Sequence, residues 1–583
     1  MKRLIFNQVP LDFSPDRDAV LSIGSFLGRE SIYPGWEDLN YVEIFDNIDE
    51  KINDYTMIRG LACDHYLTRL TGRLNKYHAT NLSTEFWGVL IKPWMLLFIN
   101  MSWFLYLQLT KFIKQHNSEA FEVEILINKH PWDFVDTMDF INRGYRDISF
   151  HHWLLSLFLQ EIDPKDWLMT PVYINGTIGQ STPSNKRKSG ILRWLNDKIS
   201  GLSYSQRCVG VYGMSRVQQL IFSLYLELKP RRKSNGILPA ANLESLGRRN
   251  YTGYFPASYL KVIDNQIENI IPKVFRDGFD EHYSRIKKSK YVKNRLRLIG
   301  PVHWYDDKEK YLLAGAKEQG EKVVCTQHGG VYGTGRIPNI IPDLEYVHEH
   351  FFSWGWQKHD PFQVRAFALP SPMLSKLRKT RRLSRKTDKL VFAGTLLSPF
   401  ELRFDILPSG KQLLLYRREK IEFLQRLSSS IYSKTLYRTM PVNYPIYLEE
   451  KEYLLRFFPT LVFLEGMTVP HPEMMKCRLL VLDNPQTALH ISLASNIPTV
   501  CYWNKNNRMI ADSARPYFDA LEQAGVIQRD GETAARKVNE IWDHVEDWWN
   551  SRDIQAARAA WCQEFARTDR FWWWPWINTL GKI

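Results

Sequence analysis

The stretch LRLIGPVHWYDDKEKYLLAGAKEQGEKVVCTQHGG (296–330) decides the fold. Its first residues form a short apolar run, and a helical segment follows at 307–319 until Gly320 ends it. The run KVVC (322–325) then has the β-branched residues of a buried strand. Two strands joined by a helix pair in parallel through a right-handed crossover, so this stretch predicts an α/β unit.

The same alternation returns after residue 388. Apolar strand-like runs lie at 389–395, 435–441, 459–466, 477–487 and 497–503, with helical segments at 411–432 and 488–495. This pattern predicts a second parallel sheet covered by helices. About the first 290 residues have mainly helical spacing, as do roughly the last 70.

The predicted fold class is α/β, with two Rossmann-type lobes, a large helical N-terminal elaboration and a helical C-terminal tail. We expect the elaboration and first lobe at 1–374, and a basic linker at 375–388. The second lobe is expected at 389–545 and the helical tail at 546–583. A cleft between two such lobes is a usual place for a substrate.

Composition excludes several classes of protein. Of 583 residues, 44% are hydrophobic and 24% charged, which is ordinary for a globular chain and excludes a disordered one. The six cysteines form no CxxC pair, which argues against a disulfide scaffold or zinc ribbon and fits a reducing compartment. A net charge of +14 suggests an anionic partner or simply a solvated basic face. Because the basic runs are scattered and no nucleic-acid motif occurs, we do not expect a nucleic-acid partner.

Two apolar segments bear on the membrane. The uncharged run PWMLLFINMSWFLYLQLT (93–110) reaches the lower limit of a membrane span, but four polar residues interrupt it. We expect a buried helix there, broken or kinked near Pro93. The C-terminal RFWWWPWINTLGKI (570–583) either lies at a membrane interface or docks on the protein.

The loop after the run KVVC is the first candidate site. It contains Gln327, His328, Gly329, Gly330 and Tyr332, at a strand end where α/β sheets place ligands. Glycines let a substrate approach the backbone, and the histidine can take a proton from an attacking hydroxyl. The alternative is a glycine-rich turn whose histidine only bonds the backbone.

The second candidate is DNPQT (483–487), at another strand end. Asp483 or Asn484 caps the following helix, whose N-terminus favours anions, and Gln486 and Thr487 stand beside it. A simple helix cap is equally compatible. Arg438, after the strand TLY, suits a phosphate grip or is a surface residue.

Carboxylates lie near both ends of the first unit. Asp306, Asp307 and Glu309 either cap a helix or act in the site, and Glu345 and Glu349 lie beyond the His–Gly loop. Either of the last two would orient His328, act as a base or serve as a nucleophile, and spacing does not choose among these. No HExxH motif occurs, and we expect no metal.

Four blocks carry a family resemblance. They are LNKYHATNLSTEFWGVLIKPWM (74–95), TQHGGVYG (326–333) with SWGW (353–356) behind it, LDNPQTALHISLASNIPTVCYWN (482–504) and PYFDALEQAGVIQRDGETAARKVNEIWDHVEDWW (516–549). In them the sequence resembles a family of bacterial transferases encoded in spirochaete-type O-antigen and other surface-polysaccharide loci. The resemblance implies a GT-B-like pair of lobes and a transferase making lipopolysaccharide, capsule or a related glycan.

One position departs from the resemblance. The third block should carry an acidic residue after the threonine, where GT-B enzymes often hold the donor ribose, but this sequence has His490. A weaker similarity exists to polyol-phosphate polymerases, which use CDP-activated donors. Two alternatives therefore stay open: a phosphotransferase of this kind, and a non-catalytic protein that binds glycan or membrane.

The main hypothesis is a glycosyltransferase of bacterial surface polysaccharide. Asp483, Asn484, Gln486, Thr487 and Arg438, with His490, would bind a nucleotide-activated sugar, and the first lobe would bind a glycan or lipid-linked glycan. His328, helped by Glu345 or Glu349, would be the base. No cofactor or metal is expected, since helix N-termini and basic residues offset phosphate charge. We expect a cytoplasmic protein, held by its basic surface at the inner face of the cytoplasmic membrane.

Overall fold

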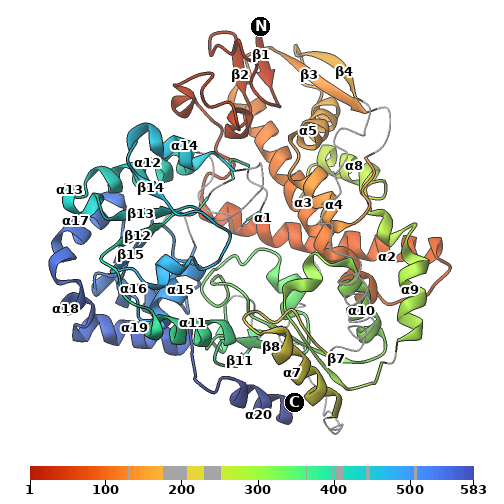
Figure 1. Cartoon of the computed structure of the whole chain (residues 1–583). Coiled ribbons are helices and arrows are strands. Elements are labelled where there is room, and N and C mark those ends of the chain that lie inside the picture. The colour runs from red at the N-terminus through yellow and green to blue at the C-terminus, as the bar shows by residue number, and fades with distance from the viewer. Residues whose placement is uncertain are drawn as a thin grey trace, which may run out of the picture.

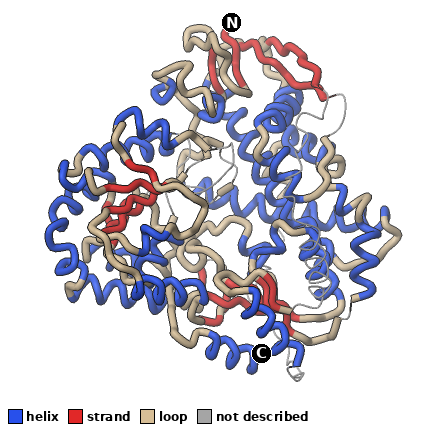
Figure 2. The backbone as a smooth tube through the Cα atoms, viewed as in Figure 1, coloured by secondary structure: helices blue, strands red, loops and turns tan. Residues whose placement is uncertain are grey.

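Three parallel sheets form the framework of the chain, seen as separate groups of strands in Figure 2. The computed structural model describes residues 1–128, 132–174, 207–228, 251–289, 291–360, 362, 364–396, 398–400, 403–404, 411–440, 447–504 and 509–583. Helices lie around and between the sheets (Figure 1). An additional antiparallel pair, β9 (Lys358–His359) and β10 (Val364–Arg365), lies outside them.

The N-terminal region contains a sheet that the sequence did not predict. Its order is β2-β1-β3-β4, with β1 (Lys2–Ile5), β2 (Asp18–Val20), β3 (Phe121–Asn128) and β4 (Leu168–Ile174). The expectation of a mainly helical first half was therefore incomplete. Strands β1 and β2 are too short to give a period, whereas β3 begins with alternating buried and exposed residues.

The first lobe is built on a five-stranded parallel sheet in the order β11-β8-β7-β6-β5. Its strands are β5 (Cys208–Val209), β6 (Leu296–Ile299), β7 (Lys322–Thr326), β8 (His350–Ser353) and β11 (Phe367–Ala368). The predicted strand–helix–strand unit is confirmed as β6, α10 (Asp307–Glu318) and β7. Asp306 caps α10 by accepting from the Lys308 and Glu309 amides.

The second lobe has a six-stranded parallel sheet in the order β14-β13-β12-β15-β16-β17. Its strands are β12 (Leu390–Ala393), β13 (Thr435–Arg438), β14 (Val462–Phe463), β15 (Leu479–Leu482), β16 (Thr499–Tyr502) and β17 (Ile527–Gln528). Every residue of β15 and β16 is buried, as in a parallel sheet covered on both faces. The predicted second α/β unit is therefore confirmed.

Helices cover these sheets and link them. The N-terminal layer, residues 1–174 and 251–289 as far as they are described, holds α1 (Ile48–Gly60), α2 (Leu67–Tyr77), α3 (Thr84–Gln115), α4 (Thr137–Phe140), α5 (Ile148–Ile162), α8 (Ala257–Gln266) and α9 (Phe279–Lys288). The other helices are α7 (Arg216–Leu228), α11 (Pro372–Leu383), α12 (Lys411–Gln425), α13 (Ser429–Tyr432), α14 (Glu450–Phe457), α15 (Thr487–Ala494), α16 (Arg515–Gln523), α17 (Gly531–Ile541), α18 (Val545–Trp549), α19 (Arg552–Glu564) and α20 (Trp573–Lys582).

The expected basic linker is largely a helix. Residues 372–383 form α11, where Ser371 caps the N-terminus by accepting from the Leu374 amide. Its Arg381 is buried and donates to the carbonyl of Met475 in the second lobe. The segment therefore attaches the lobes to each other instead of leaving a free connection.

Helix α3 is the one helix of the described residues long and apolar enough to cross a membrane, by length and composition alone. A buried core helix passes the same test, and 89% of its most apolar window lies inside the molecule. The predicted buried helix is confirmed. Pro93 lies within α3 and does not end it.

The C-terminal tail crosses from the second lobe to the first (Figure 1). Trp572 and Trp576 are buried in one cluster with Phe352 of β8, and the Trp576 indole donates to the Pro370 carbonyl. The tail is helical and docked on the protein, as one of the two expectations had it. Phe571, Trp573 and Trp574 remain exposed.

Candidate active site

A cleft of about 390 Å³ opens where the two lobes meet the N-terminal layer. The His–Gly loop of the first lobe and the loop before α15 both line it, although 157 positions separate Gly330 from Thr487. The structure therefore brings the two main predicted motifs together. The predicted residues that line the cleft are His328, Gly329, Gly330, Tyr332, Asn484, Gln486 and Thr487.

His328 and Glu345 form a hydrogen-bonded pair on the cleft wall. His328 Nε2 lies 3.0 Å from Glu345 Oε1, and Glu345 Oε2 accepts a 2.9 Å hydrogen bond from the Tyr332 hydroxyl. Burial and the Glu345 charge raise the pKa of Tyr332, so this hydroxyl stays protonated. Since a carboxylate only accepts, Nε2 carries the proton and Nδ1 is the basic nitrogen of the neutral ring. The Glu345 side chain is 1% exposed and that of His328 is 22% exposed, so the imidazole alone faces the cleft.

The helix that carries Glu345 is braced from behind. Glu345 lies in a short π-helix, η8 (Pro342–Tyr346). In the same helix, both oxygens of Asp343 accept from the Arg59 guanidinium of α1, at 2.6 and 2.8 Å. Arg59 and Asp343 are both buried, so this bidentate pair fixes η8 to the N-terminal layer.

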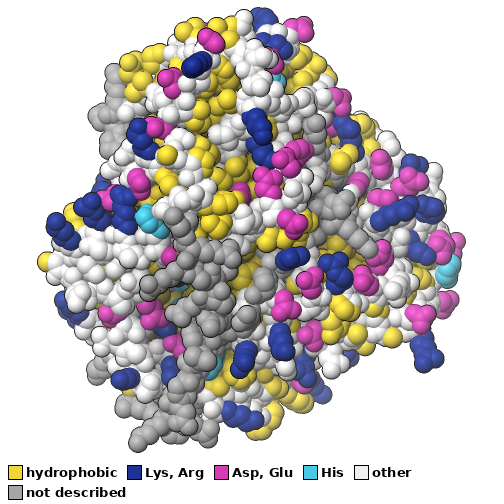
Figure 3. All heavy atoms as spheres, turned by 180° about the vertical axis from the view of Figure 1, so that it is seen from behind, with side chains coloured by type: hydrophobic (Ala, Val, Ile, Leu, Met, Phe, Trp, Pro, Cys, Tyr) yellow, Lys and Arg dark blue, Asp and Glu magenta, His cyan; other side chains and the backbone are white. Residues whose placement is uncertain are grey.

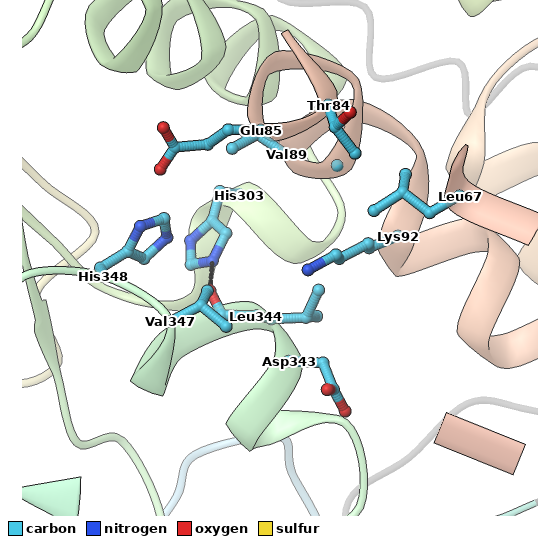
Figure 4. A pocket seen from close by; sticks show the side chains of 11 residues that line it. Leu67, Thr84, Glu85, Val89, Lys92, His303, Asp343, Leu344, Val347 and His348 are labelled. Carbon is cyan, nitrogen blue, oxygen red and sulfur yellow. Dashed lines mark hydrogen bonds between the residues drawn. The ribbon is translucent and has the colours of Figure 1, made fainter. Parts of the chain in front are cut away.

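A second cavity, of about 250 Å³, is lined by Asp343 and Leu344 of η8 (Figure 4). The His303 ring in its wall has Nδ1 3.0 Å from the Gly300 carbonyl and Nε2 3.4 Å from the Leu344 carbonyl. Burial lowers the pKa of His303, so the ring is neutral at pH 7. Lys92 of α3 projects into this cavity in Figure 4. A neutral ring has one N–H, so it donates to only one of these two carbonyls, and the shorter contact is the one to Gly300.

The two lobes touch at Gly330 and Thr487. The Gly330 amide donates a 3.0 Å hydrogen bond to the Thr487 hydroxyl at the start of α15. A Cβ on residue 330 would stand 2.5 Å from the Thr487 nitrogen, so only glycine permits this approach. The loop therefore presents backbone, and the first turn of α15, to any ligand in the cleft.

Asp483 supports the cleft from inside the second lobe. Its fully buried carboxylate accepts from the Thr395 amide at 3.0 Å and lies 3.3 Å from the Lys420 ammonium. Lys420 in turn donates to the Thr395 carbonyl at 2.7 Å and pairs with Glu450. Asp483 thus fixes the loop at Thr395, which lines the cleft, and does not line it itself.

Four other predicted residues have structural partners. Arg438 donates to the carbonyls of the 464–468 segment, and burial lowers its pKa. Glu349 accepts from the Val323 amide and pairs with Lys317. The buried His490 ring packs edge-on against Trp354 and Trp561, and Gln327 accepts from Trp354 and Trp356. None of these four lines the cleft as the structure describes it.

The acidic residues after β6 lie at the N-terminus of helix α10. Asp306 is the cap of α10, and Asp307 accepts from Thr137 and Lys310. Burial raises the pKa of Glu309 to about 7. The capping interpretation of this cluster is therefore confirmed.

Sequence reasoning missed two cations of the cleft. Arg146, which follows the π-helix η4 (Ile141–Tyr145), and Arg403, from the second lobe, both line it, as do Tyr145 and Tyr447. Among the described lining residues there is no aspartate or glutamate. The described lining therefore carries two guanidinium groups and no carboxylate, a composition that suits an anionic ligand. No sequence signal marks Arg146, because its loop shows neither a glycine-rich pattern nor a strand end.

Comparison with known proteins identifies the family. A family model described as "LIC12162 family transferase" matches residues 2–580. The chain belongs to the LIC12162 family of transferases. This confirms a transferase family, as the sequence resemblance implied.

Other comparisons with this LIC12162 family member are distant. No curated protein sequence matches it. The S. aureus MnaA–UDP co-structure is similar with 8% identity and a TM-score of 0.30, over 77% of this chain and 93% of that one. The UDP-GlcNAc 2-epimerase from Methanocaldococcus jannaschii has 9% identity and a TM-score of 0.27, over 75% and 98%. Neither similarity is close enough to support an inference.

Proposed function

We propose that this LIC12162 family member is a GT-B-like glycosyltransferase that moves a sugar from a nucleotide-activated donor to a glycan or lipid-linked glycan of bacterial surface polysaccharide. One observation carries the proposal: the His328–Glu345 pair and the Gly330–Thr487 junction share a cleft whose described lining has two arginines and no carboxylate. We place the reaction in the cytoplasm, which the six unpaired cysteines suit.

The second lobe would hold the donor. The N-terminus of α15 at Gln486 and Thr487 favours the negative charge of a phosphate, and the Gly330 backbone lets it come close. Arg146 and Arg403 supply guanidinium groups for phosphate oxygens. This arrangement offsets the charge of a leaving nucleotide without requiring a metal or cofactor.

His328 would activate the acceptor. Its Nδ1 takes the proton of an acceptor hydroxyl as that oxygen bonds to the anomeric carbon of the sugar. The bond from the anomeric carbon to the phosphate oxygen breaks, and the nucleotide leaves with the electron pair. Glu345 stabilises the imidazolium that results, through its hydrogen bond to Nε2. Glu345→Gln should therefore lower kcat by about 10²–10⁴-fold while nucleotide binding persists.

Binding of nucleotides by the purified chain tests the donor side. We would measure thermal shifts with CMP, CDP, UDP, GDP and dTDP, with and without Mg²⁺; a hundredfold excess over Kd adds about 2.7 kcal/mol. We expect a shift with one nucleotide, lost in Arg146→Gln and kept in Arg536→Gln, which lies on the exposed side of α17. No shift with any nucleotide would contradict the proposal and favour a non-catalytic glycan- or membrane-binding protein. A CDP-selective shift with a phosphodiester product would instead identify a polyol phosphotransferase.

A further inference from the structure

One side of helix α7 is an exposed apolar stripe. Val217, Leu220, Ile221, Leu224 and Leu228 are between 48% and 82% exposed. Their spacing of three, four and seven places them on one side of the helix. The opposite side buries Phe222 and Leu226 in the first-lobe cluster. Since a solvent-facing side of a helix is normally polar, this stripe requires a cover.

The C-terminal tail, which packs beside α7, carries three more exposed aromatic residues. Phe571, Trp573 and Trp574 are 54%, 42% and 56% exposed. Helix α20 lies against α7: the Phe222 and Trp572 rings stack at 5.9 Å, and the Tyr225 hydroxyl donates to the Ile577 carbonyl at 3.2 Å. In Figure 1 both helices lie at the lower end of the molecule. We call these eight exposed side chains, five on α7 and three in the tail, the apolar face.

Cations border the apolar face. Arg216 at the start of α7, Arg570 before the aromatic residues and Lys582 at the end of α20 are all exposed. Helix α7 carries one carboxylate, Glu227, and Arg207 and Arg295 both pair with it. Asp569 accepts from the Phe571 amide beside Arg570.

This combination fits one kind of partner. Exposed tryptophans and leucines bordered by arginine and lysine are the composition of a surface that enters the headgroup region of a bilayer. The cations face anionic lipid phosphates while the apolar side chains enter the acyl boundary. Figure 3 shows the molecule from behind, and over that face Lys and Arg are largely interspersed with Asp and Glu.

We propose that the apolar face, Val217, Leu220, Ile221, Leu224, Leu228, Phe571, Trp573 and Trp574, docks this protein on an anionic lipid bilayer. The inference goes beyond the proposed reaction and does not depend on it, because it rests only on α7 and the tail. Docking is peripheral: the side chains enter the interface, and no helix crosses the membrane.

Flotation of the full chain with lipid vesicles tests the inference. We expect binding to phosphatidylglycerol–phosphatidylcholine vesicles that weakens with salt, and weak binding to pure phosphatidylcholine. Ile221→Glu/Leu224→Glu and, separately, Trp574→Glu should each lower the bound fraction about tenfold. Leu383→Glu is the matched control, because Leu383 is an exposed leucine in a basic segment of α11.

Two results would overturn the inference. One is vesicle binding by the glutamate variants equal to that of wild type. The other is absence of vesicle binding together with a concentration-dependent dimer in sedimentation that Leu224→Glu abolishes, which would assign the face to a second copy of the chain. Unchanged melting temperatures confirm that the variants are folded, as expected for exposed positions. The nucleotide shift is measured on the same variants, so failure of docking and failure of the donor site are separable.

Discussion

Replacing Gly330 with alanine tests whether contact between the lobes creates the active cleft. The new Cβ would stand 2.5 Å from the Thr487 nitrogen and 2.7 Å from the Gln486 carbonyl carbon. Ordinary contact begins at 3.4 Å, and both atoms belong to backbone, so the loops must separate by about 1 Å. The neighbouring Gly329 offers the control, since its Cβ would lie 3.7 Å from the nearest atom.

The separation should cost function more than stability. A displacement of about 1 Å at a reacting centre costs about 10²-fold in rate, whereas overpacking of this kind typically costs about 1–3 kcal/mol of unfolding free energy. We would compare Gly330→Ala, Gly329→Ala and wild type by nucleotide thermal shift and by turnover of the nucleotide that the shift identifies. We expect Gly329→Ala to stay within about threefold of wild type. Equal activity of the two folded variants would refute the reasoning, because the lobes would then work without this contact.

Two further predictions concern buried charges. Arg59→Met leaves the buried Asp343 carboxylate unpaired and should cost about 3–5 kcal/mol in urea unfolding. The exposed Arg285 pairs with a glutamate at the surface, so Arg285→Met should cost less than about 1 kcal/mol of unfolding free energy. Equal losses in the two variants would contradict the bracing role of the Arg59–Asp343 pair. Burial raises the pKa of Glu419 from 4.5 to about 7. The contribution of this side chain to the free energy of unfolding is therefore fully present below pH 4.5, and it is lost as the pH rises through 7 and the carboxyl ionises. Glu419→Gln should therefore stabilise the chain by up to about 3 kcal/mol at pH 8 and by little at pH 5. The exposed Glu452→Gln is the control. If Glu419→Gln had the same pH-independent effect as this control, burial would not raise the pKa of Glu419.

The sequence was enough to predict those features of the fold that depend on local patterns of apolar and polar residues. Strands such as β15 are four consecutive buried apolar residues, and their C-terminal ends carry polar loops in any parallel sheet. His328 and Thr487 were therefore found as strand-end residues. Their common cleft was expected, but the direct contact between Gly330 and Thr487 could not be predicted, because it depends on how two different sheets pack against each other.

Residue type alone overstated the roles of several charged groups. Arg438 was predicted to grip a phosphate, and Asp483 to cap the following helix or help bind the nucleotide-activated sugar. The structure shows each satisfying buried backbone groups, Arg438 at three carbonyls and Asp483 at the Thr395 amide. A buried charge must find such partners, and only the fold reveals whether they are protein or ligand. Arg146 is the converse, since nothing in its sequence context marks a residue that the packing of the N-terminal layer brings to the cleft.

Hydrogen bonds between the His–Gly loop and the second lobe form a seam, and this seam limits how the shape of the cleft can change. Beyond Gly330, the same loop bonds the second lobe twice more: the Arg336 amide donates to the Met509 carbonyl at 3.1 Å, and the Ala511 amide donates to the Thr334 carbonyl at 2.9 Å. The His–Gly loop belongs to the first sheet by sequence but is joined to the second lobe along this seam. A hinge movement of the lobes would therefore displace His328 relative to β7 or break these bonds.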